Sequence, residues 1–142
     1  MSQPVPTVRH VFVYGTLRRG EQRDINRLQP APVQRGWARV PGVLYDLGAY
    51  PGLRLGGQGS VLGEVYEVSA DLERQLDAIE EVWPQPNGEY LKREVLVRLE
   101  ARSFEGGREI VCVLYEIAPG RATGKPLIAS GDWVQYRAGN SA

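Results

Sequence analysis

VFVYGTLRRG, at residues 11–20, is an apolar run that stops in a glycine-bearing turn. A hydrophobic segment followed by a turn signal predicts a β-strand. Such a strand end places backbone N–H groups and the Thr16 hydroxyl at the edge of a core, where they can hold an anionic ligand. An ordinary turn after a strand has the same appearance, so a binding role depends on what the rest of the chain contains.

Turn residues divide the chain into short segments. It holds 17 glycines and 10 prolines among 142 residues, which is typical of a sheet with many turns rather than of a helical bundle. The separators Pro41-Gly42, Gly56-Gly57 and Gly106-Gly107 stand between apolar runs, and the last of them predicts a hairpin. The predicted strands are His10–Tyr14, Trp37–Val40 with Leu44–Leu47, Val61–Val68, Glu94–Leu99 and Ile110–Ile117.

One helix is predicted over residues 70–81. Ser69 is the expected N-cap, and acidic residues in the first turn suit the helix dipole. At about 100° per residue, Glu80 falls beside the apolar stripe, whereas Glu81 falls on the solvent side. Glu80 is therefore the glutamate expected to face inward, with a raised pKa that suits proton transfer. A boundary salt bridge from Glu80 to Lys92 or Arg93 is the alternative. The stripe itself consists of Leu72, Leu76 and Ile79.

Composition narrows the classes of function. Seventeen basic and 17 acidic residues give a net charge of zero, so no overall field attracts nucleic acid or an anionic membrane. With one histidine, His10, and one cysteine, Cys112, the chain offers no internal disulfide, no His/Cys metal site and no Cys/His pair beyond these two. Cys112 is interpreted as a small core residue. The arginines of the N-terminal third are interpreted as a solvated face, with a phosphate-binding groove as the alternative: Arg18, Arg19, Arg23, Arg27, Arg35 and Arg39.

The totals also bear on domain organisation and location. A chain of 142 residues, 42% hydrophobic and 24% charged, predicts one globular domain over 1–142 with its core at about 10–133. The N-terminal residues lack a signal-peptide pattern, and no run of about 18 apolar residues occurs. We therefore expect a soluble, cytoplasmic protein that binds neither nucleic acid nor membrane. The sequence leaves its oligomeric state open.

Several motifs, taken in order, resemble the γ-glutamylcyclotransferase-like superfamily, in particular its AIG2-like and γ-glutamylaminecyclotransferase branch. The likeness spans about residues 10–133. Its motifs are Tyr14-Gly15-Thr16-Leu17, Gly48-Ala49-Tyr50-Pro51-Gly52, Leu76-Asp77-Ala78-Ile79-Glu80, Tyr90 with basic residues nearby, and Gly131-Asp132-Trp133 after the strand that carries Tyr115.

The resemblance implies an α+β, mostly β fold: a mixed, largely antiparallel β-barrel with short flanking helices and a cavity at its mouth. It implies release of a γ-glutamyl group as 5-oxoproline, with Glu80 as the catalytic residue and no cofactor or metal. Backbone N–H groups of Tyr14, Gly15, Thr16 and Leu17 would hold the substrate's α-carboxylate. Tyr50, Tyr90 and Tyr115 would line the pocket.

The implied chemistry agrees with the residue types. The substrate's own α-amine attacks its γ-carbonyl, so the enzyme needs no serine or cysteine nucleophile. One carboxyl group can take the proton from that amine and return it to the departing amine. Holding the glutamyl chain curled makes the reaction intramolecular.

Three features depart from the family pattern or leave it open. Glu81 stands where the family commonly has glycine, and its charge could raise the pKa of Glu80. The segment 82–89 is long and is expected either to border the pocket or to be an ordinary surface loop. The family's Tyr-x-Arg pattern appears as Tyr90-Leu91-Lys92-Arg93, so either basic residue could take the basic position.

Other interpretations remain open at this point. The three pocket tyrosines could instead pack in the core, as aromatic residues in strands often do. Asp77 is expected to be exposed or to support the helix rather than to be catalytic, and Asp132 and Trp133, near the C-terminus, are expected to fasten the barrel. The chain could also be a non-catalytic protein that binds a small carboxylate in the same cavity, or a partner-binding domain that uses Trp37 or Trp83.

Overall fold

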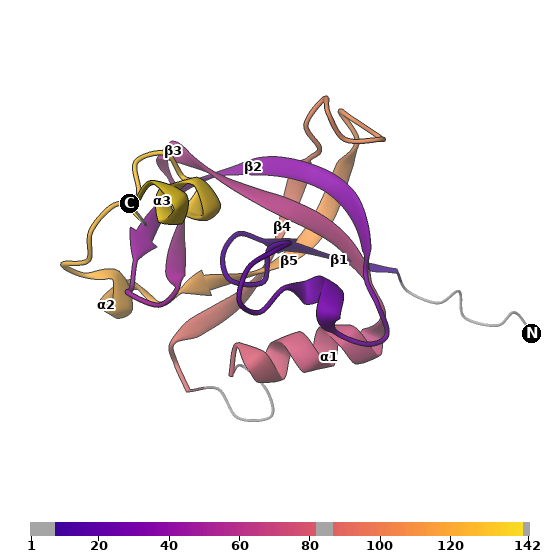
Figure 1. Cartoon of the computed structure of the whole chain (residues 1–142), viewed down its shortest axis with the longest axis horizontal. Helices are drawn as coiled ribbons and strands as arrows, with labels where there is room; N and C mark the ends of the chain where they lie inside the picture. The colour runs from indigo at the N-terminus through magenta and orange to yellow at the C-terminus, as the bar shows by residue number, and fades with distance from the viewer. Residues whose placement is uncertain (1–7, 82–86, 141–142) are drawn as a thin grey trace, which may run out of the picture.

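The computed structural model describes residues 8–81 and 87–140. Five strands form one sheet in the order β2-β3-β1-β5-β4 (Figure 1). The strands are β1 (Arg9–Val13), β2 (Val33–Asp46), β3 (Pro51–Val68), β4 (Tyr90–Arg98) and β5 (Glu109–Ile117), and the helical elements are η1 (Ile25–Arg27), α1 (Ala70–Ile79), α2 (Pro119–Ala122) and α3 (Trp133–Asn140).

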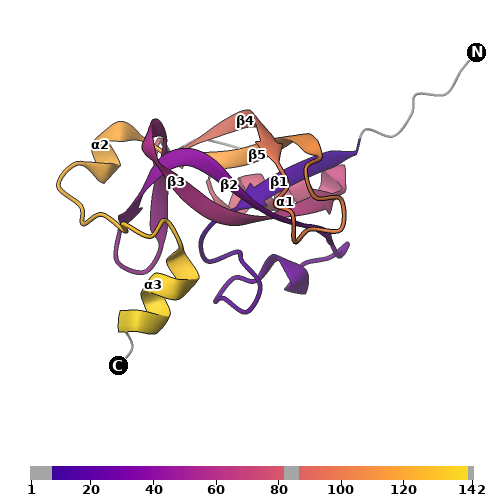
Figure 2. The same ribbon diagram turned by 90° about the horizontal axis from the view of Figure 1, so that it is seen from above.

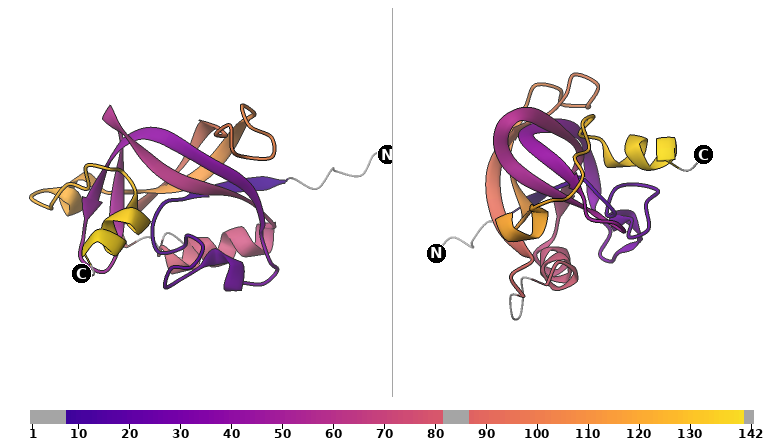
Figure 3. Two further views of the ribbon diagram at one scale, coloured as in Figure 1. Left: turned by 45° about the horizontal axis from the view of Figure 1, so that its top comes forward. Right: turned by 90° about the vertical axis from the view of Figure 1, so that its left-hand side faces the viewer.

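The sheet is mixed and largely antiparallel. β1 pairs parallel with β5 and antiparallel with β3, and the outer pairs β2–β3 and β4–β5 are antiparallel. The predicted α+β, mostly β class is confirmed, but the predicted barrel is wrong because the sheet does not close. Closure needs a ladder between the two edge strands, and in the described residues the one bridge at this place joins Ala38 of β2 to Leu99, which follows β4. The sheet curls strongly without closing (Figure 3).

Strands are longer than the turn signals predict. Pro41-Gly42 does not divide β2, and Gly56-Gly57 does not interrupt β3. Instead the register shifts there, because Pro41 faces Ser60 while Gly42 faces Leu55. Both separators are thus absorbed in an irregularity of the β-bulge type. The hairpin predicted at Gly106-Gly107 is confirmed between β4 and β5.

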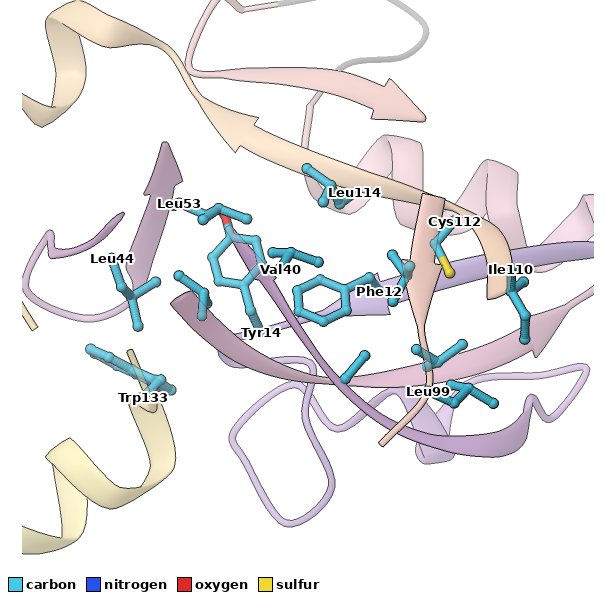
Figure 4. Packing of buried hydrophobic residues seen from close by; sticks show 14 of the residues in the cluster. Phe12, Tyr14, Val40, Leu44, Leu53, Leu99, Ile110, Cys112, Leu114 and Trp133 are labelled. Atoms are coloured by element: carbon cyan, nitrogen blue, oxygen red, sulfur yellow. The ribbon is translucent and has the colours of Figure 1, made fainter. Parts of the chain in front are cut away.

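Alternation along β1 divides the core into two clusters. Phe12 and Tyr14 point into one cluster, which includes Trp133 (Figure 4), whereas Val11 and Val13 point into the other. Cys112 is a buried free thiol, as predicted. α1 covers the second cluster beside the segment that carries η1 (Figure 3), and α2 and α3 lie at the far end of the sheet from the start of β1 (Figure 2).

The predicted helix is confirmed with a slightly earlier end. The Ser69 hydroxyl accepts a hydrogen bond from the Leu72 N–H at 3.0 Å, so Ser69 is the N-cap. The last helical residue is Ile79 and Glu80 is the C-cap. No helix in the described part of the chain is long and apolar enough to cross a membrane.

One of the N-terminal arginines is buried, which contradicts the predicted solvated face. Arg18 is 6% exposed. Its guanidinium bonds Glu64 of β3 at 3.0 Å and Asp132, just before α3, at 2.8 Å. Arg18 thereby ties the turn after β1 to the C-terminal segment. Asp132 and the fully buried Trp133 fasten that segment, as predicted.

Candidate active site

A cavity of about 510 Å³ opens where β1 ends, between the turn after β1 and the C-terminal end of α1. All eight residues that the sequence analysis assigned to the site line it: Tyr14, Gly15, Thr16, Leu17, Tyr50, Glu80, Tyr90 and Tyr115. Segments far apart in the sequence therefore meet at one place, including the start of β4. Of the segment 82–89, residues 82–86, with Trp83, lie outside the described residues, whereas Glu89 lines the cavity.

The turn after β1 supplies hydrogen-bond donors. Its carbonyl groups are occupied, because those of Gly15, Thr16 and Leu17 accept bonds from the N–H groups of Arg18, Arg23 and Ile25 at 2.8 to 3.0 Å. Within the described residues, the N–H groups of the same three residues donate no hydrogen bond. Three donors without an acceptor, beside a cavity, form a site suited to a carboxylate or an oxyanion.

Gly15 is required by a close approach. A Cβ atom at this position would lie 2.7 Å from the Pro51 side chain. The absence of a side chain lets the start of β3 pack directly against the turn, and this contact holds Pro51 in the cavity wall.

Glu80 lies at the end of α1 with its carboxylate unpaired. Its N–H bonds the Leu76 carbonyl at 2.9 Å and so completes the last turn of the helix. No donor or cation of the described residues bonds its carboxylate. Burial raises the pKa of Glu80 to about 7, opposed by Arg23 and reinforced by Glu89 and Glu81.

The salt bridge considered from the sequence is not formed. Lys92 pairs instead with Glu73 and Asp77, and Arg93 pairs with Glu116. The inward direction of Glu80 arises from the helix end rather than from a helical face, since the last helical residue is Ile79.

Glu81 borders the cavity mouth but is exposed, as predicted. Its carboxylate accepts a hydrogen bond from the Asn87 side chain at 2.9 Å. The backbone at Glu81 has φ 56°, in the left-handed region that favours glycine. This conformation explains why glycine suits the position and why a glutamate there is strained.

The cavity tyrosines commit their phenol protons to protein acceptors. Each phenol donates to another protein group, and among bonds from the described residues only the oxygen of Tyr14 also accepts one, from the Leu53 N–H. The acceptors are the Tyr115 carbonyl for Tyr14, Glu89 for Tyr50, the Pro51 carbonyl for Tyr90 and Asp77 for Tyr115, at 2.6 to 3.0 Å. The remaining phenol oxygens can therefore accept hydrogen bonds from a ligand.

Asp77 was predicted to be exposed or to support the helix, and the first of these alternatives is wrong. Its side chain is 14% exposed and accepts bonds from the Tyr115 hydroxyl at 2.7 Å and the Lys92 ammonium at 2.9 Å. Burial and Asp77 raise the pKa of Tyr115 above its usual range. In the motif Leu76-Asp77-Ala78-Ile79-Glu80, Asp77 precedes Glu80 by three residues. Residues three apart are neighbours on a helix surface, and this spacing is the sequence feature that could have placed Asp77 near the site.

Arg23 also lines the cavity and was not predicted to do so. It is exposed, and its guanidinium bonds none of the described residues. In the sequence it could not be distinguished from its arginine neighbours, because the loop that presents it has no periodic pattern.

Comparison with known proteins identifies the family. The model of the family "Gamma-glutamyl cyclotransferase, AIG2-like" matches residues 11–135. The crystal structure of an AIG2-like protein from Mus musculus has a TM-score of 0.69 and 29% identity, covering 88% of each chain. The chain therefore belongs to the AIG2-like γ-glutamyl cyclotransferase family.

Two curated relatives share part of their length with this chain. A Vibrio cholerae protein named "Putative gamma-glutamylcyclotransferase" is 51% identical over 73 residues, which are 51% of this chain and 62% of the relative. A γ-L-glutamyl-butirosin B γ-glutamyl cyclotransferase from Niallia circulans is 37% identical over 99 residues, which are 69% of this chain and 60% of the relative. The matched regions thus span under two thirds of both relatives.

Proposed function

We propose that this protein is a γ-glutamyl cyclotransferase that releases 5-oxoproline and a free amine from a small γ-glutamyl amide. The observation that carries the proposal is the unpaired carboxylate of Glu80, with a pKa of about 7, in one cavity with three free backbone N–H groups. A general acid–base works best when its pKa lies near the working pH. Family membership supports the same reaction.

The proposed reaction needs one proton-transfer group. Ionised Glu80 takes a proton from the substrate's α-ammonium, and the freed amine attacks the γ-carbonyl carbon to form a C–N bond and a tetrahedral oxyanion. Protonated Glu80 then passes its proton to the departing nitrogen as the original C–N bond breaks. The regenerated Glu80 carboxylate takes the second proton from the ring nitrogen and passes it to the released amine, which leaves as an ammonium ion. The products are 5-oxoproline and an ammonium ion, and the atoms and protons balance without water or a redox partner.

The two sides of the cavity would orient the substrate. The free N–H groups of Gly15, Thr16 and Leu17 form the donor side, which suits the α-carboxylate or the oxyanion. Phenol oxygens with their protons committed elsewhere form the acceptor side, which suits the α-ammonium. Holding both ends would keep the glutamyl chain curled for ring closure.

The test is direct detection of 5-oxoproline by chromatography and mass spectrometry. Purified protein is incubated with a panel of γ-glutamyl amines and γ-glutamyl amino acids, and each is compared with its α-glutamyl isomer, in which ring closure would expel water and leave the amine attached. Release from γ-linked substrates alone is the expected result. Ligand-dependent melting without release from any substrate would favour the non-catalytic binding protein.

Activity should rise with pH through a midpoint near 7. Glu80 must be ionised in the free enzyme to accept a proton, so kcat/KM should increase as pH passes the Glu80 pKa of about 7. Because the charge of Glu81 raises this pKa, Glu81→Gln should shift the midpoint to lower pH. Rate profiles between about pH 5 and pH 9 measure the midpoint, and a flat profile would contradict the role of Glu80.

Tyr115 and Asp77 should act together on the substrate's ammonium. Tyr115→Phe removes one acceptor, and hydrogen bonds to charged groups contribute about 1.5–3 kcal/mol, so affinity for a γ-glutamyl amide should fall about 10- to 100-fold. Asp77→Asn should have a smaller effect in the same direction, since it loosens the phenol orientation. Calorimetric titration measures both.

The matched control ligand is the glutaryl amide, which lacks the ammonium. Its affinity should change little in either variant, whereas general damage to the cavity would weaken both ligands equally. Tyr45→Phe is the control variant, because Tyr45 does not line the cavity.

A further inference from the structure

A second cavity, of about 410 Å³, adjoins the candidate active site. It lies between η1 and the end of α1, and its lining residues are Arg23, Asp24, Arg27, Leu28 and Ile79. Arg23 and Ile79 also line the first cavity. The two spaces therefore meet at the residue before Glu80.

The charged groups of the second cavity leave it positive. Asp24 is its only carboxylate, and both of its oxygens are occupied by bonds from the Gly20 N–H and from the main-chain and side-chain nitrogens of Asn26. Arg23 and Arg27 pair with no carboxylate of the described residues. The only bond from the Arg27 guanidinium to a described residue goes to the Gln22 carbonyl. Two guanidinium groups against the one carboxylate of Asp24 leave the hollow with a net positive charge, which attracts an anion.

The acidic residues of the first cavity other than Glu80 have partners. Glu89 accepts a bond from Tyr50 and lies 3.7 Å from Arg121, and Glu81 accepts a bond from Asn87. Apart from Glu80, the charged side chains around the two cavities with the fewest partners among the described residues are thus those of Arg23 and Arg27.

The proposed reaction places the departing nitrogen beside Glu80, which must protonate it. Ile79 immediately precedes Glu80 and forms the border between the cavities, so a group attached to that nitrogen has a short path into the second cavity. Its aliphatic part would contact Ile79 and Leu28. A carboxylate on the carbon next to that nitrogen would meet the guanidinium of Arg23, which lines both cavities.

We infer that the second cavity is the subsite for the leaving amine, and that Arg23 selects amines that bear a carboxylate. This inference rests on the proposed function. It predicts that the protein prefers γ-glutamyl amino acids with an aliphatic side chain as substrates. Neutral or cationic γ-glutamyl amines should react more slowly.

The test compares γ-glutamyl-leucine with γ-glutamyl-leucinamide, which differ in one negative charge. Wild-type kcat/KM should favour the carboxylate about fivefold, as expected for a partly solvated ion pair. Arg23→Gln should remove that preference, so that the ratio of the two kcat/KM values falls to about one. High salt should weaken the preference in the wild type. Arg98→Gln, at an exposed position of β4 outside both cavities, is the matched control.

Each outcome decides the inference. Equal rates in the wild type, or an equal loss for both substrates in Arg23→Gln, would overturn it, the latter by assigning Arg23 to the glutamyl half. If neither substrate yields 5-oxoproline, the proposed function fails instead. Calorimetry with the same two ligands then tests the subsite alone: tighter binding of the carboxylate that Arg23→Gln abolishes supports it, and equal binding overturns it.

Discussion

Glu80→Gln is expected to lower kcat/KM for 5-oxoproline release by about 10²–10⁴-fold, the usual contribution of a general acid–base. Glutamine keeps the size of the side chain and its hydrogen-bonding capacity but cannot accept the α-ammonium proton. The loss should appear in kcat more than in KM, because the groups that hold the substrate are unchanged. Steady-state rates with the best substrate of the panel provide the measurement.

The same variant should be no less stable than the wild type above neutral pH. The pKa of Glu80 is raised from its ordinary value of 4.5 to about 7 in the folded protein. The folded state therefore binds the proton more tightly than the unfolded state, and ionisation of Glu80 destabilises the fold increasingly between these two pH values. Glutamine has no charge, so Glu80→Gln should remove this cost. Urea unfolding at two pH values measures it.

Glu105→Gln is the control for both measurements. Glu105 lies in the loop between β4 and β5, pairs with Arg108 and is outside the cavity. Its replacement should leave release and stability nearly unchanged. Substantial 5-oxoproline release by Glu80→Gln would remove Glu80 from the proposed mechanism, and a large loss of stability at high pH would make its role structural.

Residues close in sequence or on regular elements could be predicted well. The turn at residues 14–17 follows a buried strand, and α1 carries both a side-chain cap and an apolar stripe, so local patterns located Glu80 near the core. Its final direction depends on the helix end, which periodicity places only within a residue or two.

Residues whose role depends on tertiary contacts could not be predicted. Asp77 is oriented by Lys92 and Tyr115, from β4 and β5, which helical periodicity does not reveal. Arg18 and Arg23 belong to one arginine-rich segment, yet one is buried against Glu64 and the other borders the cavity. Sheet closure likewise depends on whether two edge strands meet, which no local signal specifies.

Arg18→Met is expected to lower the free energy of unfolding by about 3 kcal/mol, because removing one partner of a buried ion pair leaves the other charge unpaired. Methionine fills a similar space, so the loss reports charge rather than a void. Glu64, at 4% exposure, would keep its bonds from the Arg19 N–H and the Tyr66 hydroxyl but lose its cation. Urea unfolding measures the change, and Tm should fall by about 10 °C.

A double variant separates charge from packing. Glu64→Gln can still accept the bonds from Arg19 and Tyr66, so adding it to Arg18→Met should recover part of the lost stability. Arg39→Met, at an exposed position, should change stability by less than about 0.5 kcal/mol. If the double variant is less stable than Arg18→Met alone, an unpaired Glu64 charge is not the cause of the loss.

Arg18→Met should also weaken substrate binding at the candidate site. Arg18 follows the three free N–H groups directly, and its N–H bonds the Gly15 carbonyl at 3.0 Å. Its guanidinium anchors this turn to Glu64 and Asp132, so loss of the anchor should loosen the donors before the whole chain unfolds. Substrate affinity in Arg18→Met should therefore fall at temperatures where the variant is still folded, whereas in Arg39→Met it should not.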